Sequence, residues 1–361
     1  MSARSDRPLR YADTGVDIDA ADATVDRYRE LARRTRRPEV LGGVGPFAGL
    51  FQLDTSAHVD PVLVGSADGV GTKMLIASAM GRYDTVGHDL VNHCVNDILT
   101  TGAEPLFFLD YLATADLSQD RRVEIVAGIG AACEANGCAL LGGETADMPD
   151  LYASGDYDLA GFIVGVVSRE RVLDGSKIRA GDALIALPST GLHTNGYSLV
   201  REAFGVGKGV GPDHDRDVLD REYEELGSTL GEALLAVHAS YLDEVRPVLD
   251  RVHGIAHITG GGIPGNLPRV LPDGLGAMID RASWRVPGIF DLIQTVGHVE
   301  DEEMMRTFNM GVGIILAVAS EDAPGLLREL AGSWRLGEVV ERAEGAPSIE
   351  TNEGASTDRR G

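Results

Sequence analysis

Lysine is scarce in this chain, and long apolar runs are missing. Only Lys73, Lys177 and Lys208 are present, so arginine supplies most of the 32 basic side chains, against 56 acidic ones. The formal net charge of −24 repels phosphate backbones and anionic lipids, which argues against nucleic acid and membranes as partners. No apolar run is long enough to span a membrane, and the N-terminal residues lack the apolar core of a signal peptide. We therefore expect a cytoplasmic location.

Cysteine is also rare, and the three that are present form no C-x-x-C pair. Cys94, Cys133 and Cys138 lie among apolar neighbours, so buried thiols in a reducing compartment are expected. Acidic residues, by contrast, are spread through the whole chain. Because dissolved cations screen the mutual repulsion of such charges, this pattern predicts a halophilic protein adapted to concentrated salt. An ordinary acidic cytosolic protein is the alternative.

The length and the order of the predicted elements indicate an α/β (α+β) protein with two domains. At 361 residues the chain can bury a large core without disulfides or a structural metal. Strands and helices alternate on both sides of a turn-rich stretch at 174–176. We expect an N-terminal domain at 1–170, a C-terminal α/β domain at 171–345 and a disordered tail at 346–361.

The predicted elements follow from the spacing of apolar residues, and an acidic loop is expected at 207–225. Helical spacing predicts helices at 22–35, 85–101, 118–136, 228–250, 288–296 and 323–331, and another from 197 onward. Apolar runs predict strands at 62–66, 105–113, 138–141, 159–167, 183–187, 254–258, 275–280, 311–319 and 335–341.

The predicted helix at 85–101 has two different faces. One stripe is apolar, and the other carries Asp89, His93, Asn96 and Asp97 at positions i, i+4, i+7 and i+8. A carboxylate on such a stripe is usually only solvated. An amide, an acid and a histidine close together are less usual, and magnesium needs only one or two carboxylates.

Residues 66–73 (SADGVGTK) follow directly after a predicted strand. Glycine N–H groups can converge on an anion, and Asp68 and Lys73 beside them suit a phosphate with Mg²⁺. The segment lacks the spacing of the common P-loop, and a tight turn with incidental charges is the alternative. Together with Asp97 and with Glu144, which follows a glycine pair, it suggests one metal–nucleotide site.

Two later segments also carry polar groups next to glycine. Residues 189–196 join a strand to a helix and offer hydroxyls, an amide and free N–H groups, as a phosphate cradle would. Simple capping of the helix by Thr194 or Asn195 is the alternative. His257 precedes a glycine run at 260–265 that fits G-x-G-x-x-G. Prolines within and just after that run break the long helix that a dinucleotide site requires, so we set that interpretation aside.

In combination these segments resemble one family, the phosphoribosylformylglycinamidine cyclo-ligases, also called aminoimidazole ribonucleotide synthetases. The likeness covers about residues 10–340 in order. The matching stretches are YADTGVDID at 11–19, TRRPEV at 35–40, DGVGTK at 68–73, DILTTGAEP at 97–105, GGETADM at 142–148, HTNGYSLVR at 193–201, HITGGG at 257–262 and RTFNMGVG at 306–313.

The resemblance implies an ATP-dependent cyclo-ligase of purine biosynthesis. Such an enzyme converts ATP and formylglycinamidine ribonucleotide to aminoimidazole ribonucleotide, ADP and phosphate, by phosphorylating the formyl oxygen and then closing the ring. The implied fold has two domains, and the N-terminal sheets of two subunits pair into a barrel across a homodimer. The implied cofactors are ATP and Mg²⁺, with ATP near the dimer interface.

The resemblance also implies roles for individual residues. His193, Thr194 and Asn195 would bind the ribonucleotide, and Lys73 and His257 would be catalytic, His257 by proton transfer. Arg29 stands where some relatives carry a lysine linked to the nucleotide site. The residues implied to bind ATP are Asp68, Gly69, Gly71, Thr72, Lys73, Asp97 and Glu144, with Asp68, Asp97 and Glu144 as magnesium ligands.

Related enzyme classes share this acid-and-glycine scheme. Selenophosphate synthetases generally carry a reactive Cys or selenocysteine before the first glycine loop, and no cysteine precedes Cys94 here. The hydrogenase maturation protein of the superfamily ends in a cysteine-containing tail, which this chain lacks. A thiamine-phosphate kinase remains an alternative. A non-catalytic nucleotide-binding subunit is another, although the complete set of acids with Lys73 argues against it.

Overall fold

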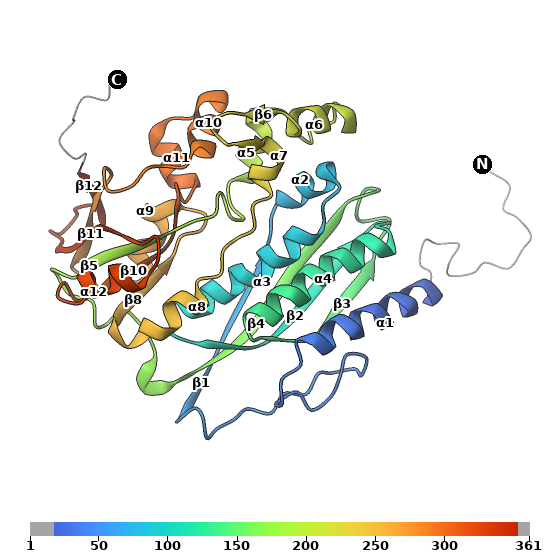
Figure 1. Cartoon of the computed structure of the whole chain (residues 1–361), viewed down its shortest axis with the longest axis horizontal. Helices are drawn as coiled ribbons and strands as arrows, with labels where there is room; N and C mark the ends of the chain where they lie inside the picture. Colours follow the sequence, from blue (N-terminus) through green and yellow to red (C-terminus); the bar gives the residue numbers. More distant parts are fainter. Residues whose placement is uncertain (1–17, 353–361) are drawn as a thin grey trace, which may run out of the picture.

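Two large sheets, besides a two-stranded one formed by β6 and β7, organise the protein, whose computed structural model describes residues 18–352 (Figure 1). The first sheet has four strands in the order β1-β4-β2-β3, and the second has six in the order β12-β9-β11-β5-β10-β8. The chain passes from one sheet to the other between residues 168 and 183, a stretch that contains the turn where we expected the domain boundary. The mixed two-part architecture predicted from the sequence is confirmed.

The elements of the N-terminal half are α1 (Ile18–Arg34), β1 (Pro61–Gly69), α2 (Lys73–Met80), α3 (Asp84–Leu99), β2 (Glu104–Thr114), α4 (Gln119–Ala135), β3 (Ala139–Asp147) and β4 (Tyr157–Ser168). Those of the C-terminal half are β5 (Ala183–Pro188), α5 (Tyr197–Phe204), α6 (Pro212–Leu219), β6 (Glu222–Tyr223), β7 (Ser228–Thr229), α7 (Leu230–Leu234), α8 (Leu242–Val245), β8 (Val252–His257), α9 (Gly262–Asn266), β9 (Leu275–Asp280), α10 (Gly288–Gly297), α11 (Asp301–Thr307), β10 (Val312–Val318), α12 (Ala323–Glu329), β11 (Trp334–Glu341) and β12 (Ile349–Asn352).

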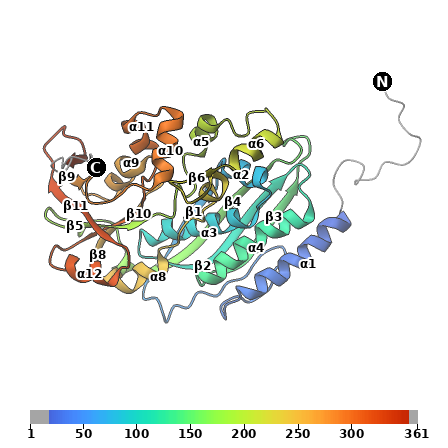
Figure 2. The same ribbon diagram turned by 45° about the horizontal axis from the view of Figure 1, so that its top comes forward.

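Helices cover one face of the N-terminal sheet. Helix α3 packs on β1 and β4, α4 packs on α3 and β3, and α1 lies beside α4, as the second view also shows (Figure 2). Phe108 and Leu112 of β2 point to this covered face and are fully buried. Leu63 of β1 and Phe162 of β4 point to the other face and remain 60% and 45% exposed, because no helix among residues 18–352 lies over them.

The junction between the two halves is made by α2, which contacts α6 and α7, and by α3. Besides its own sheet, α3 contacts α8 and the strand β8 of the C-terminal half. Strand β10, predicted from its long apolar run, is buried along its whole length and lies between β5 and β8. The C-terminal end of β8 is therefore held next to the polar stripe of α3.

The structure differs from the sequence prediction in several short segments, and α9, α11, β6 and β7 are among the elements that were not predicted. Helix α2 was not predicted, and α6 lies within the expected acidic loop. Residues 235–241 form no helix, although 228–250 was predicted to be helical. Strand β12 pairs in parallel with β9, so the expected disordered tail is wrong at Ile349–Asn352, where backbone hydrogen bonds order the chain. Residues 1–17 and 353–361, including most of the matching stretch at 11–19, lie outside the described residues.

The three cysteines are buried and unpaired, as predicted from their apolar neighbours. In the described part of the chain, no helix has both the length and the apolar character needed to cross a bilayer.

Candidate functional site

Two of the three predicted metal-binding acids lie together at the junction. Asp68 is at the end of β1 and Asp97 is in the last turn of α3, with His93 between them. His93 Nε2 is 2.8 Å from Asp68 Oδ2 and 3.9 Å from Asp97 Oδ2. Ser66 Oγ donates to Asp97 Oδ2 at 2.8 Å. The polar stripe of α3 thus meets the glycine loop, as the sequence suggested.

The local hydrogen bonds favour the charged forms of these groups. Burial raises the pKa of Asp68 and Asp97, but the histidines that donate to them outweigh it, and both pKa values are lowered overall. For His93, burial lowers the pKa, yet the bond to Asp68 and the charges of both acids raise it above its usual value. A pair of carboxylates that stays charged at neutral pH, with Asp68 40% exposed, suits a hard divalent cation.

Glu144 lies apart from this acid pair. It is on β3, at the opposite edge of the sheet from β1. The strand pairing runs from Gly69 to Ala160, then to Tyr111, and then to Glu144. Three strand spacings place Glu144 roughly 14 Å from the end of β1. The expectation that the acids at 68, 97 and 144 form one cluster is therefore wrong within a single chain, because the sheet separates β1 from β3.

Lys73 is fully buried at the start of α2 and does not face open space. Its Nζ lies 2.8 Å from Asp89 Oδ2 and donates to the carbonyl oxygens of Ala236 at 2.7 Å and His193 at 3.2 Å. Burial lowers the pKa of Lys73 and raises that of Asp89, and the ion pair opposes both shifts. In this conformation the ammonium group contacts one carboxylate and two carbonyl oxygens of the chain itself, so the phosphate contact implied for Lys73 stays a prediction.

The polar stripe of α3 holds residues 236–241, which we call the strap. Asp89 Oδ1 accepts from the backbone N–H of His238 at 2.8 Å, and Asn92 Nδ2 donates to the carbonyl oxygen of His238 at 2.7 Å. Asn96 donates to the carbonyl of Ala239 at 2.8 Å and accepts from the N–H of Tyr241 at 3.0 Å. Side chains take the place of helical partners, which explains why the strap is not helical.

Three buried histidines gather where the strap meets β8. The ring of His238 stacks on His193 with centroids 3.8 Å apart, and its Nε2 is 3.2 Å from His257 Nε2. His257 Nδ1 lies 2.9 Å from Asp97 Oδ1. Burial lowers the pKa of all three rings, so they are neutral at pH 7. The sequence pointed to His193 and His257, whereas His238 lay in a segment predicted to be ordinary helix.

These histidines do not form a convincing metal centre of their own. Ring nitrogens of His193, His238 and His257 lie within 4.8 Å of one another. However, the rings of His193 and His238 are only 16° from parallel, so their in-plane lone pairs run side by side and do not converge on one ion. The oxygen ligands of Asp68 and Asp97 fit magnesium better.

The predicted substrate loop at 193–195 lies directly across from the acid pair. Thr194 Oγ1 is 2.7 Å from His93 Nδ1, and the side chain of Asn195 has a buried Nδ2 with no hydrogen-bond partner. A Cβ on Gly260 would lie 3.0 Å from Asn195 Oδ1, so the glycine run lies against this loop. Helix α9, which follows that run, has five residues, too short for a dinucleotide site.

Asp110 is a buried acid that no sequence pattern singled out. It lies on β2 opposite Gly143, and a Cβ at Gly143 would be 2.2 Å from its Oδ1. Burial raises the pKa of Asp110 to about 7. The second glycine of the Gly142-Gly143 pair is thus needed to admit this carboxyl, which lines a cavity of about 740 Å³ that Glu144 also lines.

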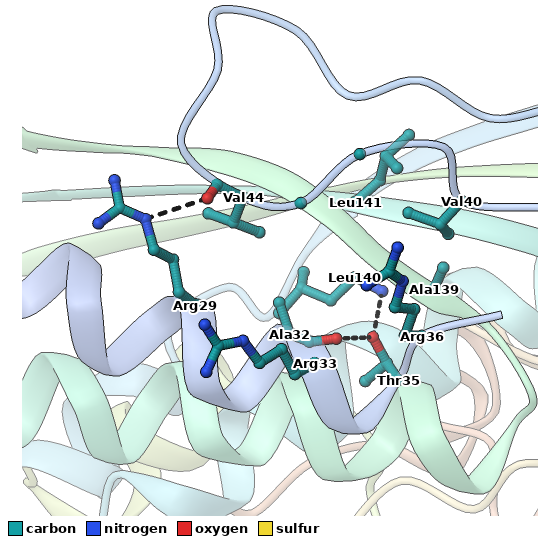
Figure 3. Close-up of a pocket in the computed structure, with 12 residues that line it drawn as sticks. Arg29, Ala32, Arg33, Thr35, Arg36, Val40, Val44, Ala139, Leu140 and Leu141 are labelled. Carbon is teal, nitrogen blue, oxygen red and sulfur yellow. Dashed lines mark hydrogen bonds between the residues drawn. The ribbon is translucent and has the colours of Figure 1, made fainter.

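A smaller pocket of about 330 Å³ lies between α1 and the start of β3 (Figure 3). Arg29 lines it and donates from Nε to the carbonyl oxygen of Val44 at 3.1 Å. Thr35 Oγ1 accepts from the N–H of Leu140 at 2.8 Å, which ties the end of α1 to β3. Arg29 also forms an ion pair with Asp26, so the positive charge of its guanidinium group already has a partner within the chain.

Comparisons with known proteins agree with the two-part fold. Residues 52–167 match the family model described as "AIR synthase related protein, N-terminal domain", and residues 179–350 match the corresponding C-terminal domain. The phosphoribosylformylglycinamidine cyclo-ligase of Desulfitobacterium hafniense is 50% identical over 93% of this chain and 98% of its own length. The enzyme of the same name from Myxococcus xanthus is 54% identical over 89% and 92%.

Solved structures with the same fold are more distant in sequence. Thiamine-monophosphate kinase from Stenotrophomonas maltophilia superposes with a TM-score of 0.64 at 17% identity, covering 92% of this chain and 97% of its own. Hydrogenase maturation protein HypE, solved in complex with ATP, gives a TM-score of 0.61 at 18% identity, covering 89% of each chain. At these identities the likeness establishes the fold alone.

Proposed function

The chain belongs to the phosphoribosylformylglycinamidine cyclo-ligase family, and we propose that it works at the junction of its two halves. It is an ATP-dependent cyclo-ligase of purine biosynthesis, which closes the ring of aminoimidazole ribonucleotide from formylglycinamidine ribonucleotide and releases ADP and phosphate. One observation carries the placement: Asp68 of the first half and Thr194 of the second contact the same imidazole, that of His93.

The nucleotide end is assigned to the acid pair. Asp68 and Asp97 present charged oxygens, and the Asp68 carboxylate is partly exposed, which is what a Mg²⁺ ion carrying ATP phosphates requires. When bound, Mg²⁺ would neutralise charge on the phosphates. Asp68 and Asp97 would hold it, and the backbone N–H groups of the loop from Gly69 to Thr72 would line the phosphates.

The ribonucleotide end is assigned to Thr194 and Asn195. The buried, unpartnered Nδ2 of Asn195 is a donor without an acceptor, which is costly unless a ligand oxygen satisfies it. We assign the ribose 5′-phosphate to this donor and to the Thr194 hydroxyl. His193 has a left-handed backbone, φ 62°, and turns the chain so that both side chains follow it.

The reaction depends on how the two substrates are positioned more than on covalent catalysis by side chains. An amide oxygen leaves poorly, so ATP phosphorylates the formyl oxygen, the amidine nitrogen closes the five-membered ring, and phosphate departs. Phosphoryl transfer relies mainly on alignment and charge neutralisation. Both ring nitrogens of His257 are engaged, one by Asp97 and one by His238, so we propose that it orients Asp97, and the proton-transfer role stays an expectation.

We further propose a homodimer in which two N-terminal sheets close into a barrel. The uncovered face presents Leu63 and Phe162, and exposed apolar residues of this size gathered on one face are typical of a subunit interface. Glu144 and the acid pair lie at opposite edges of the sheet, so Glu144 can serve the metal only if closing the barrel brings these edges together.

Replacing Phe162 by aspartate should shift the protein from dimer to monomer, because it buries a charge in the proposed interface. Sedimentation velocity measures the change. Val210, 66% exposed in the C-terminal half, supplies the matched control, and Val210→Asp should leave the dimer intact. A Phe162→Asp protein that remains dimeric would contradict the barrel.

For the wild type we expect the dimer fraction to rise with KCl concentration. Two chains that each carry a charge of −24 repel each other, and dissolved cations screen this repulsion. The same measurement tests the halophilic assignment.

Thr194→Ala and Asn195→Ala should raise KM for the ribonucleotide more than KM for ATP. These groups contribute binding that ground and transition states share, so kcat should fall less than kcat/KM. Steady-state kinetics with each substrate varied in turn gives the answer. A larger loss of ATP affinity would show that the two phosphate positions have been exchanged.

The proposed function itself is tested by ATP turnover against a panel of substrates. The panel contains formylglycinamidine ribonucleotide and thiamine monophosphate, and the aminoimidazole product is detected directly. We expect turnover and product with the first only. Turnover with thiamine monophosphate alone would assign the chain to a kinase.

We also propose that the protein works in the cytoplasm without nucleic acid or membrane partners.

A further inference from the structure

His93 is the point where three segments of the protein meet. It lies on α3, its ring is only 4% exposed, and its two nitrogens point to different halves of the molecule. Nε2 is 2.8 Å from Asp68 Oδ2 at the end of β1, and Nδ1 is 2.7 Å from Thr194 Oγ1 before α5. One rigid ring thus connects a carboxylate of the first half with a hydroxyl of the second.

The surroundings of His93 leave this ring little freedom to turn. The rings of His238 and His257 stand edge-on to it, with centroids 5.2 Å and 5.1 Å away. His257 is held by Asp97, and the backbone of His238 is held by Asp89. A movement of the carboxylate on one side must therefore move the ring or break a buried hydrogen bond, which is costly.

Asp68 and Thr194 can each form further hydrogen bonds or bind a ligand while they remain bonded to His93. A carboxylate has about four lone-pair positions, so Asp68 can accept from His93 and from the Gly69 N–H and still face a cation. A hydroxyl has one hydrogen and two lone pairs, so Thr194 can keep His93 and make a further bond. The link through His93 can persist when both ends carry ligands.

We propose that His93 is a positioning residue that couples the two ligands, so that Mg²⁺–nucleotide on the Asp68 side and a phosphate ester on the Thr194 side each favour binding of the other. This rests on the proposed function, which places those ligands at the two ends. Residues that orient a metal-binding carboxylate typically change metal affinity ten- to a hundredfold. Coupling between two sites is reciprocal and commonly amounts to about 5- to 150-fold.

The test compares the dissociation constant of formylglycinamidine ribonucleotide with and without Mg²⁺ and a nonhydrolysable ATP analogue, by titration calorimetry. We expect the wild type to bind it at least about fivefold more tightly when the analogue is present. In His93→Leu this ratio should fall to about one. His93→Gln should keep part of it, because its amide can donate to Asp68 and accept from Thr194.

Asn92→Leu is the matched control. Asn92 is the neighbouring residue on α3 and bonds the strap, but it contacts neither Asp68 nor Thr194. Asn92→Leu should lower stability and keep the wild-type ratio. Thr194→Val removes the same contact from the other side and should lose the ratio as His93→Leu does, so the question stays answerable if His93→Leu fails to fold.

The outcomes separate this proposal from the proposed function. A wild type that turns over formylglycinamidine ribonucleotide but binds its two ligands independently overturns the coupling and leaves the function in place. The same holds if His93→Leu or Thr194→Val retains the wild-type ratio, or if Asn92→Leu loses it equally. A wild type that neither binds nor converts the ribonucleotide overturns the proposed function itself.

Discussion

Asp97→Asn should lower kcat/KM about a hundredfold while the protein stays folded. Removing one member of a preorganised charged site commonly has an effect of this size. Asparagine keeps an oxygen for the His257 Nδ1 contact, now 2.9 Å, and an amide that can meet Ser66, so the fold keeps its partners while the charge is lost. Turnover at rising Mg²⁺ measures the effect, and the variant should require more metal for half-maximal rate. Asp68→Asn should behave in the same way.

The chain offers a closely matched control for this variant. Asp182 is a buried acid of the C-terminal half whose Oδ2 lies 2.7 Å from His253 Nδ1, as Asp97 lies against His257. Asp182→Asn should lower the melting temperature and spare kcat/KM. If Asp97→Asn turned over normally at saturating Mg²⁺ and ATP, the acid pair would be structural and the assignment of the nucleotide end would fail.

The N-terminal sheet and its helices, apart from α2, could be predicted because their apolar residues repeat at clear periods. The predicted helix at 85–101 corresponds to α3, and the predicted strand at 105–113 lies within β2. The helical spacing also placed Asp89, His93, Asn96 and Asp97 on one stripe, and that stripe does face the other half. Local periodicity was enough for these features.

The misses occur where distant segments decide the local structure. The strap is not helical because side chains of α3 bind its backbone, and no pattern within residues 236–241 indicates those partners. Strand β12 exists because β9 offers an open edge. Hydrogen bonds between segments that are distant in the sequence leave no periodic pattern in it.

The same reason explains the outcome for the site. Asp68, Asp97 and Thr194 could be predicted as parts of one site, because each of the segments that carry them has a recognisable motif and the family resemblance links these motifs. Glu144 was grouped with them by its chemistry and by the same resemblance, and only the strand order β1-β4-β2-β3 reveals its distance from β1. His238 was missed because its role comes from its stacking on His193, more than forty residues earlier in the chain.

Lys73→Met should be the most destabilising of the variants considered, because it leaves the Asp89 carboxylate buried without its counter-charge. Breaking a buried pair by removing one partner typically costs about 3–5 kcal/mol. Urea unfolding should show this loss, together with a lower melting temperature. A lysine that served mainly to contact phosphate would give the opposite pattern, with stability nearly unchanged and kcat/KM strongly reduced.

The double variant Lys73→Met/Asp89→Asn distinguishes these two roles for Lys73. It removes both charges, while the asparagine oxygen can still accept from the His238 N–H that holds the strap. Since replacing both members of a buried ion pair is often close to neutral, the double variant should recover much of the stability that Lys73→Met alone loses. Because the strap and the histidines would then be held again, turnover should return with stability if Lys73 acts by positioning. Recovery of stability without recovery of turnover would instead place the Lys73 ammonium on the phosphate during the reaction, as the resemblance implies.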